Sequence, residues 1–328
     1  MMTPLRFEQL HRDEWSELEI AIGSVGTQTI SKSMSLPQTR GARVALLYRR
    51  ACEHLALARA RAYPAYIVDR LERITEDAHQ LIYHRPEVGM GRLRRVLTSE
   101  FPASVRAHRR YVAVAAAVFV LPMVIVGALV HGRPELILSV VSAETAASFE
   151  DMYSPAAESI GRVRTASTDW VMLGYYIRNN IGVSFQCFAG GLFAGLGSLF
   201  FLAYNGAFAG ALAGYLAARG MSATFFSFVA THSAFELTAI VLSGAAGLRI
   251  GHSLLAPGRL RRRPSLVRAA QDTAVLLYGV VALLVVAAFV EAFWSSARWL
   301  PPAVKYAVAA ICWTAVILYL TRQGRDAD

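Results

Sequence analysis

Long apolar segments separated by short polar ones occupy the last two thirds of the chain. The first, residues 110–131, supplies the 20 or so apolar residues needed to cross a hydrocarbon core of roughly 30 Å. The pattern predicts about six membrane-spanning helices, near 110–131, 181–204, 206–219, 223–250, 273–297 and 302–321. We therefore expect an all-α, polytopic membrane helix bundle.

The first hundred residues follow a different pattern, with apolar positions at helical spacing and charged residues between them. It predicts three amphipathic helices, at 4–22, 41–60 and 64–84. Residues 23–40 are rich in Gly, Ser and Thr and indicate a loop, and 91–101 form a short basic amphipathic stretch. The pattern predicts a soluble helical domain over 1–109 and a transmembrane domain over 110–328.

The charge distribution predicts the orientation of the spans. The net charge is +10, and nearly all of it comes from arginine, because Lys32 and Lys305 are the only lysines. The arginines cluster before the first span, between the fourth and fifth, and after the sixth. With six crossings all three clusters lie on one side, which the positive-inside rule identifies as cytoplasmic.

This orientation makes both termini cytoplasmic and places the polar, mildly acidic loop 132–170 outside. The segment 206–219 is short, and it could be re-entrant. A re-entrant segment would put the later arginines on the wrong side, so we favour a true crossing. The location expected is a bacterial inner membrane, and the basic charge is expected to meet lipid headgroups rather than nucleic acid.

Glycine pairs spaced four residues apart recur in the apolar segments. Such ridges let helix backbones approach closely in lipid, where the hydrophobic effect does not drive association. One set has three members, Gly206, Gly210 and Gly214. The other two are pairs, Gly191 with Gly195 and Gly247 with Gly251. We expect them to serve packing within the bundle, with oligomerisation or partner binding as the alternative.

Polar residues within the apolar segments are the candidates for a functional or structural centre. Asn205–Gly206 is a turn-type dipeptide, predicted to separate two spans. Asn179 and Asn180 are predicted to cap the outer start of the second span.

His232 and Glu236 lie near the middle of the fourth span, four residues apart and therefore on one helix face. Ionisable residues inside a membrane are costly and indicate a functional site by default. A buried hydrogen bond that fixes packing, an ion or substrate pathway, and partner binding all remain open. Glu291 is predicted to reach headgroups or water near the outer end of the fifth span, or to meet the outer end of another span.

Signals of catalysis or of a cofactor are missing from the sequence. His232 to Glu236 is not a zinc-protease HExxH motif, and no nucleophile elbow or P-loop occurs. The three cysteines, Cys52, Cys187 and Cys312, have no metal-ligand spacing. We expect no enzyme activity, no cofactor, no metal site and no disulfide.

The stretch from 179 to 251 resembles the stage II sporulation protein M family. The matching pieces are Asn179–Asn180, the Gly-rich 190–197, Asn205–Gly206 with Gly210, the run His232 to Leu237, and Gly244 to Leu248. The N-terminal region is also similar to family members, at positions that include Arg6–Phe7, Trp15 and Tyr48–Arg49–Arg50. Ser233 stands where the usual form of the motif has Gly.

The resemblance implies an integral membrane protein without known catalytic residues. The founding member takes part in engulfment during endospore formation, within a membrane complex that localises peptidoglycan-degrading enzymes. Relatives occur in many bacteria and archaea that do not sporulate, so the family name does not specify the role of this chain.

The function expected is that of a non-enzymatic membrane scaffold. Its partners would be the lipid bilayer and membrane or cell-envelope proteins, and it could form a homo-oligomer. The polar centre that fixes the fold would be Asn180, Asn205, Gly206, His232 and Glu236. The alternative is a channel or transporter in which His232 and Glu236 line the path.

Overall fold

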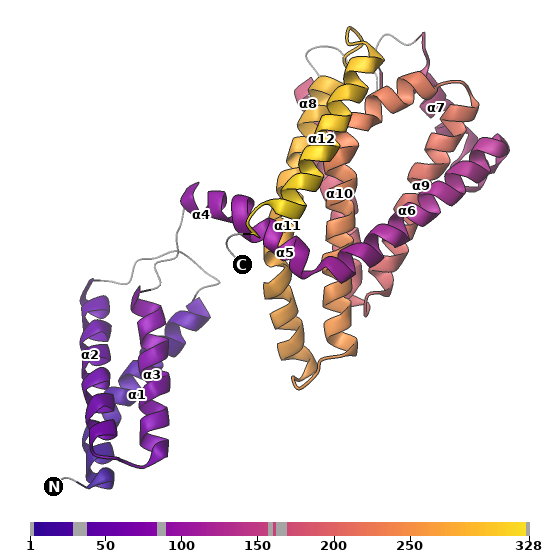
Figure 1. Cartoon of the computed structure of the whole chain (residues 1–328). Helices are drawn as coiled ribbons and strands as arrows, with labels where there is room; N and C mark the ends of the chain where they lie inside the picture. The colour runs from indigo at the N-terminus through magenta and orange to yellow at the C-terminus, as the bar shows by residue number, and fades with distance from the viewer. Residues whose placement is uncertain (1–2, 29–37, 84–89, 157–159, 162–168, 326–328) are drawn as a thin grey trace. The chain divides into compact units, whose positions relative to one another are not determined.

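The computed structural model describes residues 3–28, 38–83, 90–156, 160–161 and 169–325. The chain divides into two compact units, Met1–Val88 and Gly89–Asp328, each with its own hydrophobic core (Figure 1). All the regular structure in the described residues is helical. The all-α prediction is therefore confirmed for these residues.

The N-terminal unit consists of three helices that bury a shared apolar core. They are α1 (Pro4–Gln28), α2 (Gln38–Ala60) and α3 (Ala65–Tyr83). The largest side chains of the core are Phe7, Trp15, Leu18, Ile67 and Leu71. Residues 23–28 were predicted to begin a loop but continue α1, and residues 29–37 lie outside the described part.

Three short helices lead into the second unit and pack within it. They are α4 (Met90–Arg95), the π-helical η1 (Val96–Glu100) and α5 (Phe101–Ala107). The Phe101 ring packs where Gly279 leaves room, and Arg106 donates to the Gln323 carbonyl at 2.7 Å. The boundary between the units therefore lies at 88/89, earlier than the 109/110 boundary that hydropathy indicated.

Six long helices build the described part of the second unit. They are α6 (Arg109–Gly132), α8 (Asp169–Ala189), α9 (Leu196–Ala218), α10 (Ser222–Leu255), α11 (Arg262–Phe289), which continues as the π-helical η5 (Val290–Ser295), and α12 (Pro302–Arg322). Two shorter elements, η2 (Pro134–Ser139) and α7 (Ala143–Tyr153), lie between α6 and α8. Five of the long helices, all except α8, are long and apolar enough to cross a membrane.

The pairing of α6 with α9 shows that α8 also traverses the bundle. In Figure 1 α6 and α9 run side by side. Gly206, Gly210 and Gly214 of α9 face the backbone of α6 at Phe119, Met123 and Gly127, in the same order along both helices. The two helices are therefore parallel, and the chain must return between them through α8.

The contacts of α8 agree with this return path. Its first half packs beside Ala288 and Ala292 near the end of α11. Toward the end of α8, the Ser184 carbonyl accepts a hydrogen bond of 2.5 Å from the Ser243 hydroxyl of α10. α8 therefore extends through the same layer as α10 and α11.

The predicted break between the second and third spans at Asn205–Gly206 is wrong. The α8–α9 hairpin turns instead at 190–195, where Gly190–Leu192 form a 3-10 turn and Ala194 and Gly195 have positive φ values of 53° and 85°. Asn205 lies inside α9, and its amide donates to the Phe201 carbonyl at 2.7 Å. Because this bond satisfies the amide within the helix, the dipeptide does not end it.

Candidate functional site

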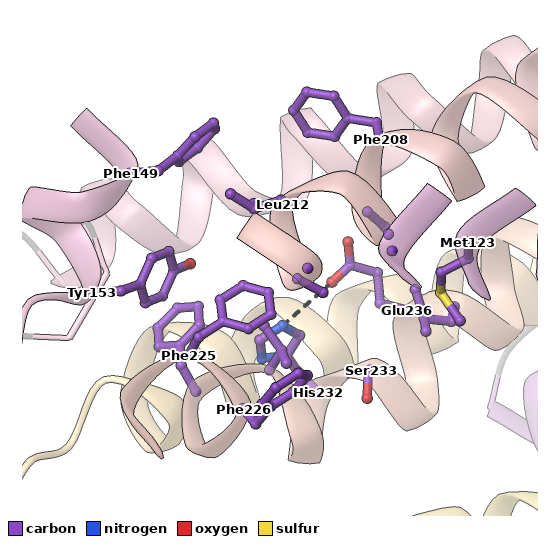
Figure 2. Close-up of a pocket in the computed structure, with 18 of the residues that line it drawn as sticks. Met123, Phe149, Tyr153, Phe208, Leu212, Phe225, Phe226, His232, Ser233 and Glu236 are labelled. Carbon is purple, nitrogen blue, oxygen red and sulfur yellow. Dashed lines mark ion pairs between the residues drawn. The ribbon is translucent and has the colours of Figure 1, made fainter. Parts of the chain in front are cut away.

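A partly open cavity of about 790 Å³ lies in the second unit, Gly89–Asp328, which is called the membrane unit below (Figure 2). Side chains from α6, α7, α8, α9, α10 and η5 line it. Most of the lining is apolar or aromatic, with a small set of polar groups from α6, α8, α10 and η5. Cavities of this size and composition are typical of small-molecule sites.

His232 is held on the cavity wall by a buried hydrogen-bond network. Its Nδ1 lies 2.9 Å from the Ser295 Oγ, which anchors the imidazole to the π-helical turn η5. The Ser295 carbonyl accepts a hydrogen bond of 2.7 Å from the Lys305 Nζ at the start of α12. This network joins α10, η5 and α12 and fixes which imidazole nitrogen faces the cavity.

Glu236 and Glu291 bring two carboxyl groups to the same wall. The His232 Nε2 lies 3.8 Å from the Glu236 Oε2, as the dashed line in Figure 2 shows. One ligand-type atom from each of His232, Glu236 and Glu291 lies within 4.8 Å of the others. Glu291 thus meets another span rather than the headgroups, since the π-helical turn directs it inward beside α10.

Asn180 adds a buried amide to this set. It is 2% exposed, and its Oδ1 accepts a 3.0 Å hydrogen bond from the Asn179 Nδ2. Among the described residues, no group accepts a hydrogen bond from the Asn180 Nδ2. Both asparagines line the cavity in the middle of α8, so the predicted capping role at a helix start is wrong.

The structure does not bring Asn205 and Gly206 to this site. Neither is among the described residues that line the cavity, and Gly206 instead contacts α6. Gly210 and Gly214 form part of the cavity wall as well as of the α6–α9 contact.

The remaining glycines of the predicted ridges meet at the hairpin. A Cβ on Gly191 would collide with the Gly247 carbonyl, and a Cβ on Gly251 would collide with the backbone of Gly195. The Gly-rich turn at 190–195 thus packs directly on the backbone of α10. This contact holds α8, α9 and α10 together at the end of the bundle where the hairpin turns.

The helix α7 lines one side of the cavity through Phe149, Met152 and Tyr153. The Tyr153 ring packs against Phe225 and Phe228, with ring centroids 5.1 and 5.7 Å apart. On the opposite side Glu150 accepts hydrogen bonds of 2.5 Å from the Tyr215 hydroxyl and 2.7 Å from the Arg219 Nε. α7 is therefore attached to both α9 and α10.

The family model described as stage II sporulation protein M matches residues 106–296. This region includes the cavity, His232 with its partner Ser295, and both glycine contacts, whereas Lys305 lies beyond it. The chain belongs to the stage II sporulation protein M family. As a member of that family, with five helices capable of spanning a bilayer, it is a multi-pass membrane protein.

The match to this family begins after the N-terminal unit, and the N-terminal unit matches a different family. Residues 5–84 match a family described as a domain of unknown function (DUF8413). This match coincides with the compact unit of α1, α2 and α3. No curated protein and no solved structure was found to match the chain.

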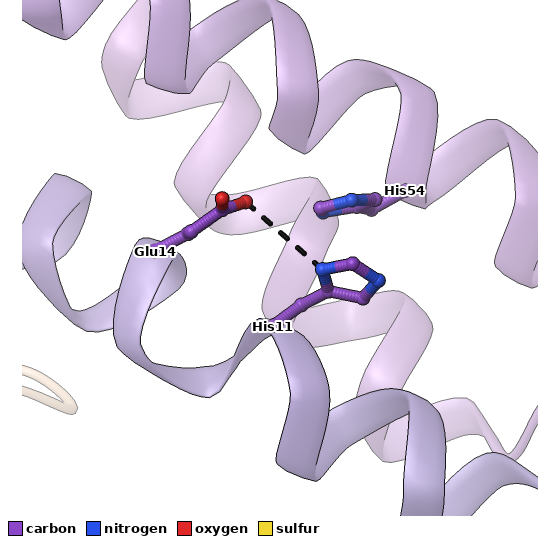
Figure 3. Close-up of side chains that lie close together, drawn as sticks. All are labelled: His11, Glu14 and His54. Atoms are coloured by element: carbon purple, nitrogen blue, oxygen red, sulfur yellow. Dashed lines mark ion pairs between the residues drawn. The ribbon is translucent and has the colours of Figure 1, made fainter.

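The N-terminal unit contains a second cluster of titratable groups, His11, Glu14 and His54 (Figure 3). The His11 and His54 rings lie 3.8 Å apart, and the His11 Nδ1 is 4.0 Å from the Glu14 Oε2. The Trp15 Nε1 donates to the His54 Nδ1 at 3.1 Å, and Arg50 pairs with Glu14. Since the Trp15 bond puts the proton of neutral His54 on Nε2, metal binding there would require that bond to break.

Burial and the nearby charge of His11 lower the pKa of His54, so its neutral form is favoured in the fold. We therefore interpret the cluster as a packing contact that joins α1 to α2.

Sequence reasoning did not assign three members of the intramembrane site in this family member. Ser295 and Lys305 were not among the predicted site residues, and for Glu291 the sequence left contact with headgroups or water and contact with another span both open. Two signals were present: Glu291 and Ser295 lie four residues apart, and Lys305 is a lysine inside an apolar segment. The aromatic walls carried no distinguishing signal, because aromatic residues are common in membrane helices.

Proposed function

We propose that the chain binds a small solute inside the membrane and carries it across the bilayer. The observation that carries this proposal is the cluster of His232, Glu236 and Glu291 on the wall of a 790 Å³ cavity. Ionisable groups in the apolar layer of a membrane are costly and mark solute or proton pathways. Fold stability alone would be served as well by apolar side chains at these positions.

The contacts around the cavity support alternating access. At the hairpin end, α8, α9 and α10 touch through glycines without intervening side chains. At the other end, α7 lies beside the cavity and is held by side-chain contacts. These are the ring contacts of Tyr153, a hydrogen bond from the Thr224 hydroxyl to the Tyr153 carbonyl, and the bonds of Tyr215 and Arg219 to Glu150. The first contact suits a rigid pivot and the second a gate that opens to one side.

The proposal includes the orientation and place of the chain. The bundle would lie in a bacterial inner membrane with both termini in the cytoplasm, because the arginine clusters then follow the positive-inside rule. The solute would pass without covalent chemistry, so no catalytic residue and no cofactor are assigned.

The test is to identify what the purified protein binds. Native mass spectrometry would compare small molecules retained by wild type, Ala209→Trp and Ala310→Trp. Ala209 lines the cavity, whereas Ala310 is exposed on α12, so only the first indole should exclude the solute. Uptake of the retained compound into proteoliposomes should follow the same order.

Loss of the compound from both tryptophan variants, or retention by both, would contradict cavity binding. Binding without uptake would leave a membrane receptor rather than a transporter.

A scaffold function is the second candidate, and the N-terminal unit favours it. This unit has its own core and its own family match, so it is built as a separate module. The membrane or cell-envelope partners of such a scaffold would dock on it. In-cell crosslinking should then recover partners with the full chain and lose them when residues 1–88 are deleted.

A further inference from the structure

The charged groups on the cavity wall have one sign. Among the lining residues that the structure describes, Glu236 and Glu291 are the charged ones, with His131 and His232 as imidazoles. The buried Lys305 does not line the cavity. Its amine donates a hydrogen bond to the Ser295 carbonyl behind the wall. A ligand at this wall therefore meets carboxyl groups and no fixed positive charge from the described lining.

The rest of the wall is unusually aromatic. Rings come from α7, α8, α9 and α10, and Figure 2 shows Phe149, Phe208, Phe225 and Phe226 around the space beside Glu236. Aromatic faces attract cations through their quadrupole, and the attraction is strongest away from water. Rings beside carboxyl groups form the combination by which proteins bind organic cations.

Asn180 indicates that the bound molecule also carries a hydrogen-bond acceptor. Its Nδ2 is buried on the same wall and donates to no acceptor among the described residues. A buried donor of this kind is unfavourable unless something accepts its hydrogen bond. An oxygen or nitrogen acceptor on a bound molecule would satisfy it.

We infer that the solute is an amphipathic organic cation. Its ammonium or guanidinium group lies at Glu236 and Glu291, its apolar part lies against the Phe225 and Phe226 rings, and an acceptor meets Asn180. The inference rests on the proposed solute-binding function and names its substrate class. A bare metal ion would use the carboxyl groups and His232 but leave the aromatic wall and most of the 790 Å³ unfilled.

The experiment uses the full-length protein in lipid nanodiscs and two probes of nearly the same shape. Benzyltrimethylammonium is cationic, and 2-methyl-1-phenyl-2-propanol is its neutral counterpart. Calorimetry should show the cation binding wild type at least tenfold more tightly than the alcohol. Because a charge-assisted contact is lost, Glu236→Gln should weaken cation binding roughly tenfold or more and leave alcohol binding nearly unchanged.

Two further variants separate the charge from the rings and from general effects. Phe226→Leu keeps an apolar side chain but removes a ring, and it should weaken the cation more than the alcohol. Glu144→Gln changes an exposed carboxyl group on α7 outside the cavity lining and should change neither affinity.

The outcomes distinguish this inference from the proposed function. Equal binding of the two probes would overturn the cation class while keeping a solute-binding cavity. Failure of both probes to bind would overturn the inference and count against the cavity function as well. Tight binding of Zn²⁺ that His232→Gln abolishes, without binding of the organic cation, would replace it with a metal site.

Discussion

The Ser295 Oγ lies 2.9 Å from the His232 Nδ1, and this hydrogen bond joins the π-helical turn η5 to the first half of α10. Both side chains are buried, at 0% and 5% exposure. π-Helical turns often occur at functional sites, because they redirect side chains that a regular helix would point elsewhere. Here the turn brings Ser295 and Glu291 together beside His232.

Replacing Ser295 with Ala should destabilise the membrane unit by about 1–3 kcal/mol, because a buried imidazole nitrogen loses its partner. The matched control is Ser296→Ala, whose hydroxyl donates to the Ala292 carbonyl of its own helix at 3.0 Å. Unfolding titrations with SDS in mixed micelles would measure both. Equal stability of the two variants would show that the His232 bond contributes nothing.

The α6–α9 contact predicts a strong position dependence of glycine substitutions. A Cβ on Gly210 would lie 2.9 Å from the Met123 Cα and collide with the Met123 carbonyl. Gly210→Ala should therefore destabilise the protein by about 1–3 kcal/mol. Gly182→Ala, at a site with nothing within 4 Å of the added carbon, should be neutral or slightly stabilising.

Thermal unfolding of the two alanine variants in the same detergent would provide this comparison. A similar melting temperature for both would mean that the helices can move apart at no cost.

Acidification should release α7 from the cavity. Hydrogen bonds from Arg219 and then Tyr215 lower the pKa of Glu150 below its ordinary value of 4.5. A carboxyl group whose folded pKa is depressed stabilises the fold above the unfolded value, and this stability is lost as the pH falls through the folded value. A spin label at Ser148→Cys should therefore become more mobile below about pH 4.5.

The control for α7 release is the same label in the Glu150→Gln background. There the label should be mobile already at neutral pH, and acid should change it little. A label that stays immobile in both backgrounds would show that the Tyr153 ring contacts and the hydrogen bond from Thr224 to the Tyr153 carbonyl hold α7 without Glu150.

The N-terminal unit should fold by itself and lose stability in mild acid. Burial first and then the charge of His11 lower the pKa of His54 below its ordinary value of 6.5. The unfolded chain therefore takes up the proton first, and stability falls as the pH drops below about 6.5. Circular dichroism melts of residues 1–88 should show this fall, and His54→Gln should reduce it.

The matched control for this acid effect is His79→Gln, at an exposed position on α3. It should keep the loss of stability in mild acid that His54→Gln reduces. A fragment without cooperative unfolding would contradict the independent core formed by Phe7, Trp15 and Leu71.

Cysteine labelling would test the topology that the α6–α9 pairing requires. If α8 crosses, a cysteine at Ala156 should be labelled from outside and one at Arg259 only from the cytoplasm. If α8 did not cross, both positions would lie outside. The measurement uses intact cells, a membrane-impermeant maleimide, and a background in which Cys52, Cys187 and Cys312 are replaced.

Local features of the fold followed from the sequence alone. Apolar segments of sufficient length predicted the spans at α6, α10, α11 and α12, and amphipathic spacing predicted the three-helix N-terminal unit. The i, i+4 spacing also placed His232 and Glu236 on one helix face. These predictions succeed because helix formation and facing depend on residues close together in the chain.

Tertiary structure alone decided where the α8–α9 hairpin turns and what surrounds His232. In a membrane the interior of the bundle and the lipid are both apolar, so hydropathy cannot reveal that Gly190–Gly195 turn against α10 while Asn205 stays helical. Glu291, Ser295 and Lys305 lie more than fifty residues from His232 in the sequence. No local sequence pattern therefore predicts that η5 and α12 pack beside His232. Their convergence follows from the pairing of helices, which depends on the shapes of whole faces.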